Sequence, residues 1–252
     1  MDRLTRRTPL VGSLLGVALV AWIVTLQRMR GMDAGPGTDL GALGWFLGIW
    51  VTMMAAMMLP AAAPTVLLFA RVRRRAHTTM FVLGYLLAWT GYGVAAYALY
   101  RAFRAVAPGF VAWDDRGPWV AGAALAFAGL YQLTPLKTAC LRHCRSPLHV
   151  LIGGRPGPLG AVRMGIEHGG YCVGCCTGLM VALFALGVMS LLWMAVVTVA
   201  IVAEKALPGG ERLGRVVAVA LVAAGLWVAV SPATVPGLTQ PTQLHVQMQM
   251  QR

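Results

Sequence analysis

The chain has 252 residues, of which 58% are hydrophobic and only 12% are charged. Soluble domains carry about 25% charged residues, so these values exclude a water-soluble enzyme of the usual kind and predict a membrane protein. The net charge of +13 lies in short basic clusters between long uncharged runs, which is typical of the flanks of membrane spans. We therefore expect the lipid bilayer as a partner and no nucleic acid.

Long apolar runs predict an all-α fold, a polytopic bundle of membrane helices. Five runs have a suitable length: residues 10–27, 42–70, 79–100, 118–136 and 215–231. A further uncharged run, residues 169–203, would be about 50 Å long as one helix, against a hydrocarbon core of roughly 30 Å. We expect a break near residues 187–190, with helices over about 165–186 and 191–205. The sequence thus predicts seven spans, with six as the alternative.

The basic residues also predict an orientation. Most of the 21 Lys and Arg residues precede the first predicted span or follow the second, fourth and sixth. Cytoplasmic loops are enriched in these residues, so we expect a multi-pass protein of a bacterial-type inner (plasma) membrane with a cytoplasmic N-terminus. Residues 1–233 are predicted to form one membrane domain, and residues 234–252 a disordered polar tail.

The five cysteines all lie between positions 140 and 176. On helices, Cys140 and Cys144 would share one face, and His168, Cys172 and Cys175 another. Thiolate and imidazole groups bind Zn(II), whereas thiolate and thioether groups are preferred by Cu(I). A buried free cysteine is often only a small apolar side chain, but this clustering favours metal or redox use. The candidate metal ligands here are Cys140, Cys144, His168, Cys172, Cys175 and Cys176, placed on the two arms of one cytoplasmic loop.

Four methionines form a second sulfur-rich pattern. Residues 50–60 read WVTMMAAMMLP, so that Met53, Met54, Met57 and Met58 would form one patch on a helix. Thioethers bind Cu(I) and few hard ions, although methionine is also a common filler of apolar helices. The patch is therefore either packing or part of a copper site.

An acidic and a basic residue close the sixth predicted span. Glu204 is predicted to pair with Lys137 or with Lys205, or to act as an oxygen ligand or proton acceptor. An ordinary ion pair at the membrane interface is an equally good interpretation.

Three sequence blocks resemble a known family. WVTMMAAMMLPAAAP, LYQLTPLKTACLRHCRSP and GIEHGGYCVGCCTGLM, followed by GVMSLLWM and EK, are similar to the predicted metal-binding integral membrane proteins called domain of unknown function 2182. The similarity covers roughly residues 44–208. It implies that the five cysteines and His168 occupy that family's Cys and His positions, and that Met54, Met57 and Met58 belong to its Met-rich helix. Thr177 and Ser190 depart from the family pattern.

Three functions remain open from the sequence. The first is binding of a soft transition metal, copper ahead of zinc, for metal handling or trafficking, with a metal chaperone or another membrane protein as partner. The second is a membrane thiol–disulfide oxidoreductase using Cys172 and Cys175, although the expected cytoplasmic side is reducing. The third is a helical subunit whose cysteines pack or hold a structural Zn(II). No phosphate loop, catalytic triad or dinucleotide fingerprint is present, so enzyme activity is not assigned.

Overall fold

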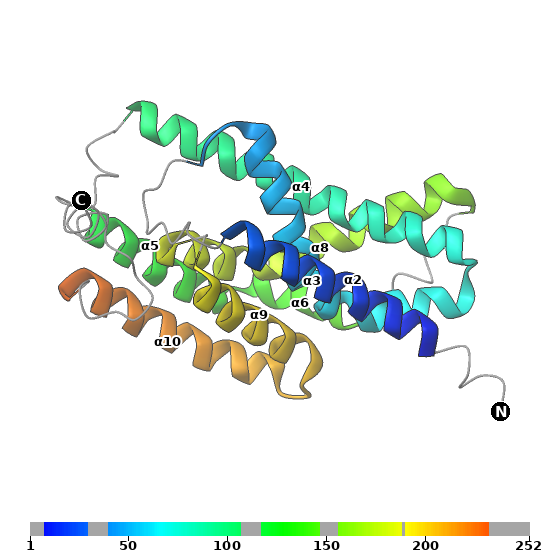
Figure 1. The fold of residues 1–252 in the computed structure, drawn as a ribbon. Coiled ribbons are helices and arrows are strands. Elements are labelled where there is room, and N and C mark those ends of the chain that lie inside the picture. Colours follow the sequence, from blue (N-terminus) through cyan, green and yellow to red (C-terminus); the bar gives the residue numbers. More distant parts are fainter. Residues whose placement is uncertain (1–7, 30–39, 107–116, 147–155, 188–189, 232–252) are drawn as a thin grey trace.

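A computed structural model describes residues 8–29, 40–106, 117–146, 156–187 and 190–231. Within these ranges the chain forms eight helices and no strand (Figure 1). The helices are α2 (Thr8–Met29), α3 (Leu43–Val72), α4 (Arg75–Val106), α5 (Gly117–Gln132), α6 (Pro135–Arg145), α8 (Gly157–Leu186), α9 (Leu191–Ala206) and α10 (Gly210–Val230). The all-α prediction is confirmed, while the predicted tail over residues 234–252 lies outside the described residues.

The predicted break in the long apolar run is confirmed. α8 ends at Leu186 and α9 begins at Leu191. Gly187 has a φ of +105°, a backbone conformation that glycine adopts without the steric cost of a side chain. The Ser190 N–H donates to the Gly187 carbonyl oxygen at 2.9 Å. Gly187, in a backbone conformation that favours glycine, therefore separates α8 from α9.

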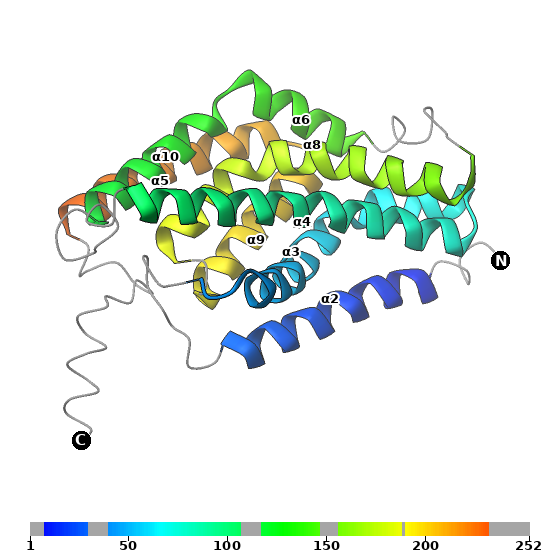
Figure 2. The same ribbon diagram turned by 90° about the horizontal axis from the view of Figure 1, so that it is seen from above.

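The loop that the sequence predicts over residues 137–163 is helical at both of its ends. The chain bends by 62° after α5 and continues as α6, which forms an apex with α5 in Figure 2. Thr134 caps α6 because its Oγ1 accepts from the Lys137 N–H at 3.3 Å, and Pro135 suits the first helical position. α8 also begins at Gly157, well before the predicted residue 165. Both cysteine groups therefore lie on helices, and Cys172 lies in the middle of α8.

Membrane-length helices are fewer than the seven predicted spans. By length and composition, five of the described helices could cross a membrane, or six if the bent pair of α5 and α6 forms one span. α9 has 16 residues, about 24 Å of helix against a hydrocarbon core of roughly 30 Å. Seven spans are therefore not confirmed.

Close packing of α4 on α8 positions the site. The two helices lie side by side along most of their length in Figure 2, and their contact is the most extensive in the fold. A Cβ at Gly165 of α8 would lie 2.9 Å from the Tyr85 backbone nitrogen and from the Phe81 carbonyl carbon on α4. The helices approach backbone to backbone because Gly165 has no side chain, and this contact brings the Tyr85 side chain onto α8.

We expect Gly165→Ala to destabilise the protein by about 1–3 kcal/mol, because its methyl group would push against α4 backbone atoms. Gly170→Ala is the matched control on the same helix, since nothing lies within 4 Å of a Cβ there. Removing glycine from that position should instead stabilise the helix by roughly 0.5–1 kcal/mol. Denaturation midpoints of the purified proteins in detergent measure both effects. Equal midpoints for the two variants would contradict the close α4–α8 contact.

Candidate metal centre

The middle of α8 presents a buried stripe of possible ligands. His168, Cys172, Cys175 and Cys176 are each 4% exposed or less. His168, Cys172 and Cys175 are spaced by one helical turn and Cys176 is adjacent to Cys175, so these side chains lie on one side of the helix. The predicted common face of His168, Cys172 and Cys175 is thus present in the structure.

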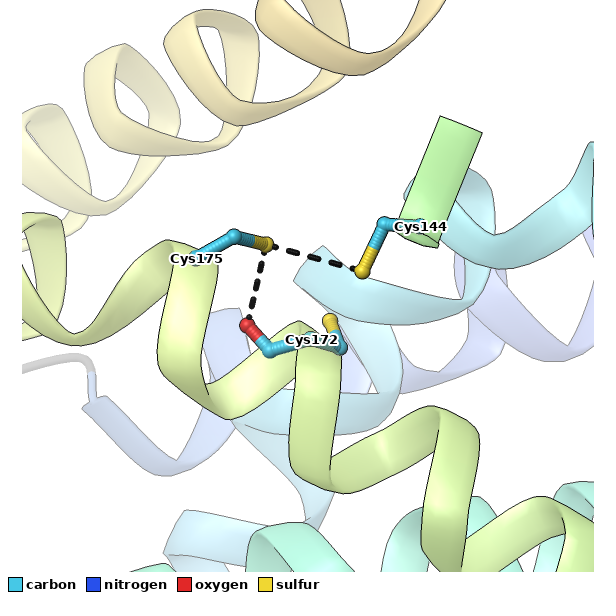
Figure 3. Close-up of side chains that lie close together, drawn as sticks. All are labelled: Cys144, Cys172 and Cys175. Carbon is cyan, nitrogen blue, oxygen red and sulfur yellow. Dashed lines mark hydrogen bonds between the residues drawn. The ribbon is translucent and has the colours of Figure 1, made fainter. Parts of the chain in front are cut away.

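Three thiols from two helices meet at this stripe (Figure 3). The sulfur atoms of Cys144 on α6 and of Cys172 and Cys175 on α8 all lie within 4.8 Å of one another. Cys144 Sγ is 3.7 Å from Cys175 Sγ, and the Cys175 thiol donates to the Cys172 carbonyl oxygen at 3.2 Å. We call these three residues the three-thiol cluster. The cluster thus brings together one cysteine of the predicted Cys140–Cys144 group and two of the predicted group on α8.

The other predicted ligands lie around the cluster and not in it. Cys176 Sγ is 3.5 Å from Cys175 Sγ but does not belong to the mutually close set. The His168 ring lies beside the rings of Phe81 and Tyr85, at a centroid distance of 5.9 Å from each. Cys140 is partly exposed, on the turn of α6 before Cys144.

The predicted methionine patch lies in the core of α3. Met54, Met57 and Met58 are each 0% exposed. A tyrosine connects this segment with the thiols, because the Tyr85 hydroxyl donates to the Met58 carbonyl oxygen at 3.4 Å and lies 3.0 Å from Cys172 Sγ. The Tyr85 hydroxyl therefore links the backbone of the methionine segment to one sulfur of the three-thiol cluster.

Two residues of the site were missed by the sequence analysis. Lys205 Nζ donates to Cys172 Sγ at 2.9 Å, and Tyr85 contacts the same sulfur from the opposite helix. An ammonium group beside a sulfur favours the thiolate, which is the form that binds metal. Lys205 was interpreted as the end of a span and as a possible partner of Glu204, and no spacing in the sequence links Lys205 or Tyr85 to Cys172.

A buried ion pair holds α6 in place. Lys137 Nζ lies 2.7 Å from Glu204 Oε2, with side chains 2% and 3% exposed, and Gln132 Nε2 donates to Glu204 Oε1 at 3.3 Å. Glu204 was predicted to pair with Lys137 or with Lys205, and in the structure it pairs with Lys137. Arg145 adds a second connection by donating to the Leu207 carbonyl oxygen at 2.6 Å. Because Cys144 lies between Lys137 and Arg145, both contacts fix its position.

The cluster supplies three sulfur donors and no oxygen donor. Structural Zn(II) sites are almost always closed by four ligands, and no fourth His, Cys or carboxylate atom among the described residues joins the mutually close set. Thiolates without a hard ligand select soft ions such as Cu(I). The three-thiol cluster can therefore hold a soft metal ion with sulfur ligands.

A comparison with known families agrees with this chemistry. A family model for PpoB2, described as a copper chaperone, matches residues 47–228. The matched range includes all five cysteines, the methionine segment of α3 and the Glu204–Lys205 end of α9. It supports a copper-related family, although not domain of unknown function 2182 by name. No curated protein and no solved structure matches the chain.

We expect Lys137→Met to destabilise the protein by about 3–5 kcal/mol, because Glu204 would keep a buried charge without its partner. The double variant Lys137→Met, Glu204→Leu removes both charges and should regain most of this loss. Arg142→Ala is the control, since it breaks the exposed pair with Glu211 and should leave the denaturation midpoint nearly unchanged. A Lys137→Met protein as stable as the wild type would refute a structural role for the pair.

Proposed function

The chain belongs to the PpoB2 copper chaperone family, and on that premise we propose that it is a membrane-embedded protein that binds Cu(I) and passes it on. The single observation that carries the proposal is the three-thiol cluster of Cys144, Cys172 and Cys175. Copper is the cargo of such a protein. The metal identity is accordingly Cu(I), with Zn(II) as the competitor that the experiments below test.

Charge and proton balance support Cu(I) binding at this cluster. Each thiol releases a proton when its sulfur binds the ion. Three thiolates around Cu(I) carry a net charge of −2, and burying uncompensated charge is costly. The ammonium group of Lys205, 2.9 Å from Cys172 Sγ, offsets part of this charge. The loaded site is thus stabilised by a cation that the fold already holds beside it.

The methionines supply a second set of soft donors. Met54, Met57 and Met58 are fully buried on α3, and the Tyr85 hydroxyl links the Met58 carbonyl oxygen to Cys172 Sγ. Thioethers bind Cu(I) and few hard ions. In our proposal they allow only Cu(I) to leave the thiols toward the interior of the bundle. His168, Cys176 and Cys140 surround the cluster and complete the predicted ligand set without being members of the mutually close three.

Exposed apolar side chains support insertion into a bilayer. The outer faces of α2, α4 and α10 carry large hydrophobic residues that are at least 40% exposed. They include Leu15, Val17, Leu19 and Val20 on α2, Leu83, Leu87, Val94 and Leu99 on α4, and Val216, Val219, Leu226 and Val230 on α10. Apolar surface of this extent marks an interaction with lipid or with another protein. We propose that it faces the lipid of an inner (plasma) membrane.

We further propose seven spans with the N-terminus in the cytoplasm, α5 with α6 forming one bent span and α9 a short one. The N-terminal ends of α2, α4 and α8 lie toward the same end of the bundle in Figure 2, as alternating spans require. The basic residues Arg71, Arg73, Arg74 and Arg75 lie at this end, where α3 ends and α4 begins. Cytoplasmic enrichment of arginine favours that orientation.

Copper content tests the metal site. The detergent-purified protein, loaded with Cu(I) under anaerobic conditions, should hold about one copper per chain that resists washing. The double variant Cys172→Ser, Cys175→Ser should hold almost none, as measured by elemental analysis. Cys176→Ser should retain the ion, because its sulfur lies outside the three-thiol cluster.

Zinc loading supplies the contrast. If Zn(II) binds the same cysteines and Cu(I) does not displace it, the proposed cargo is wrong and a structural zinc site is indicated. X-ray absorption of the copper-loaded protein should report sulfur neighbours only, since no histidine belongs to the cluster.

Reporter fusions test the seven spans. With seven spans, a periplasmic reporter such as alkaline phosphatase is inactive on the N-terminus and active when fused after residue 231. With six spans, both ends of the chain lie on the same side, so the two fusions behave alike. Activity at the N-terminus would reverse the proposed orientation.

A thiol–disulfide reaction is the second candidate function. Its support is the contact of Lys205 with Cys172 in a Cys-x-x-Cys pair, since a stabilised thiolate is also the reactive form for disulfide exchange. A protein that binds no copper, yet forms a Cys172–Cys175 disulfide reversibly with a quinone or a thiol partner, would favour this function.

A further inference from the structure

The three-thiol cluster is closed off from solvent. Cys144 is 9% exposed, Cys175 2% and Cys172 0%. A soft ion held by thiolates moves between proteins by exchange of one sulfur ligand for another, because free Cu(I) would have to give up strong thiolate bonds. A donor molecule therefore needs a sulfur that it can reach, and these three residues are at most 9% exposed.

Cys140 has the position that such an exchange requires. Of the five cysteines, all of which the structure describes, Cys140 alone is partly exposed. It lies one helical turn before Cys144 on the same face of α6, a spacing at which side chains are neighbours. It is thus the accessible sulfur beside the least buried member of the cluster.

Gly174 on α8 makes room for this sulfur. A Cβ at Gly174 would lie 2.7 Å from Cys140 Sγ, closer than any side chain would tolerate. The Gly174 carbonyl oxygen accepts a hydrogen bond from the Tyr131 hydroxyl at 2.6 Å, which fixes the backbone here. Gly174 directly precedes Cys175. Cys140 therefore lies in the seam between α6 and α8, one turn before Cys144 on α6 and beside the residue that precedes Cys175 on α8.

We propose that Cys140 is the receiving thiol of this protein: it accepts Cu(I) from a donor that carries the ion on an accessible thiolate and passes it to Cys144 and Cys175. The inference rests on the proposed copper function and adds the route of loading and the chemistry of the donor. Exposure falls in the order of transfer, from Cys140 through Cys144 to Cys175 and Cys172. The ion thus moves inward along sulfurs of decreasing exposure.

The exchange needs no redox partner. The Cys140 thiol loses its proton as its sulfur binds Cu(I), and the donor sulfur takes up a proton as its bond to copper breaks. Cys144 then loses its proton and binds the ion, while the Cys140–copper bond breaks and Cys140 is protonated again. Copper remains Cu(I) throughout, and no electron is transferred.

Loading kinetics test the proposal on the full chain in detergent. Wild type and Cys140→Ser are mixed anaerobically with the Cu(I)–glutathione complex, and thiolate-to-copper absorbance is followed by stopped flow. Affinity at equilibrium is measured separately by competition with bathocuproine disulfonate. We expect Cys140→Ser to load about tenfold more slowly, a barrier higher by about 1.4 kcal/mol, with stoichiometry and affinity close to wild type. The matched variant Cys144→Ser should instead lose affinity.

Gly174→Ala gives a second test that keeps every thiol. Its methyl group displaces the Cys140 sulfur, so loading should slow as in Cys140→Ser, and adding Cys140→Ala should cause no further slowing. Wild-type loading rates in Cys140→Ser, or a loss of affinity as large as that of Cys144→Ser, would overturn the receiving role alone. A wild-type chain that takes up no Cu(I) would overturn the copper function as well.

Discussion

The ion pair between Lys137 and Glu204 is the contact on which the metal centre depends. Cys144 is the member of the three-thiol cluster that does not belong to α8, and α6, which carries it, is a helix of 11 residues. A short helix gains little stability from its own hydrogen bonds. Its position comes from the buried pair at its start and from the Arg145 contact with the Leu207 carbonyl oxygen at its end. Without these contacts the cluster would be two thiols on one helix.

Adjacent residues of α9 serve both sides of the site. Glu204 holds α6 through Lys137, and Lys205 contacts Cys172 on α8. The C-terminal end of α9 therefore positions α6, which carries Cys144, and places an ammonium group beside Cys172 on α8. Tyr85 completes the surroundings from α4, where the glycine-mediated contact with α8 places its hydroxyl between Cys172 and the methionine segment.

The sequence was sufficient for features that depend on local pattern. Apolar runs and the break before Leu191 follow from hydropathy and from the special backbone of Gly187, and helical periodicity placed His168, Cys172 and Cys175 on one face. A helical turn was predicted at Cys140 and Cys144, but α6 was not predicted as a helix of 11 residues, because its polar sequence follows an apolar run and resembles a loop. The contacts of Lys205 and Tyr85 with Cys172 join residues 33 and 87 positions apart, and no local pattern encodes such tertiary contacts.

The pairing of Lys137 with Glu204 also bears on how the protein is made. The two residues are 67 positions apart in the chain, and all three cluster cysteines precede Glu204. During synthesis the cysteines therefore leave the ribosome before the residue that fixes α6 exists. A partly synthesised chain therefore has the thiols without their final spacing, because that spacing depends on Glu204. The three-thiol cluster is therefore assembled only after α9 has been synthesised.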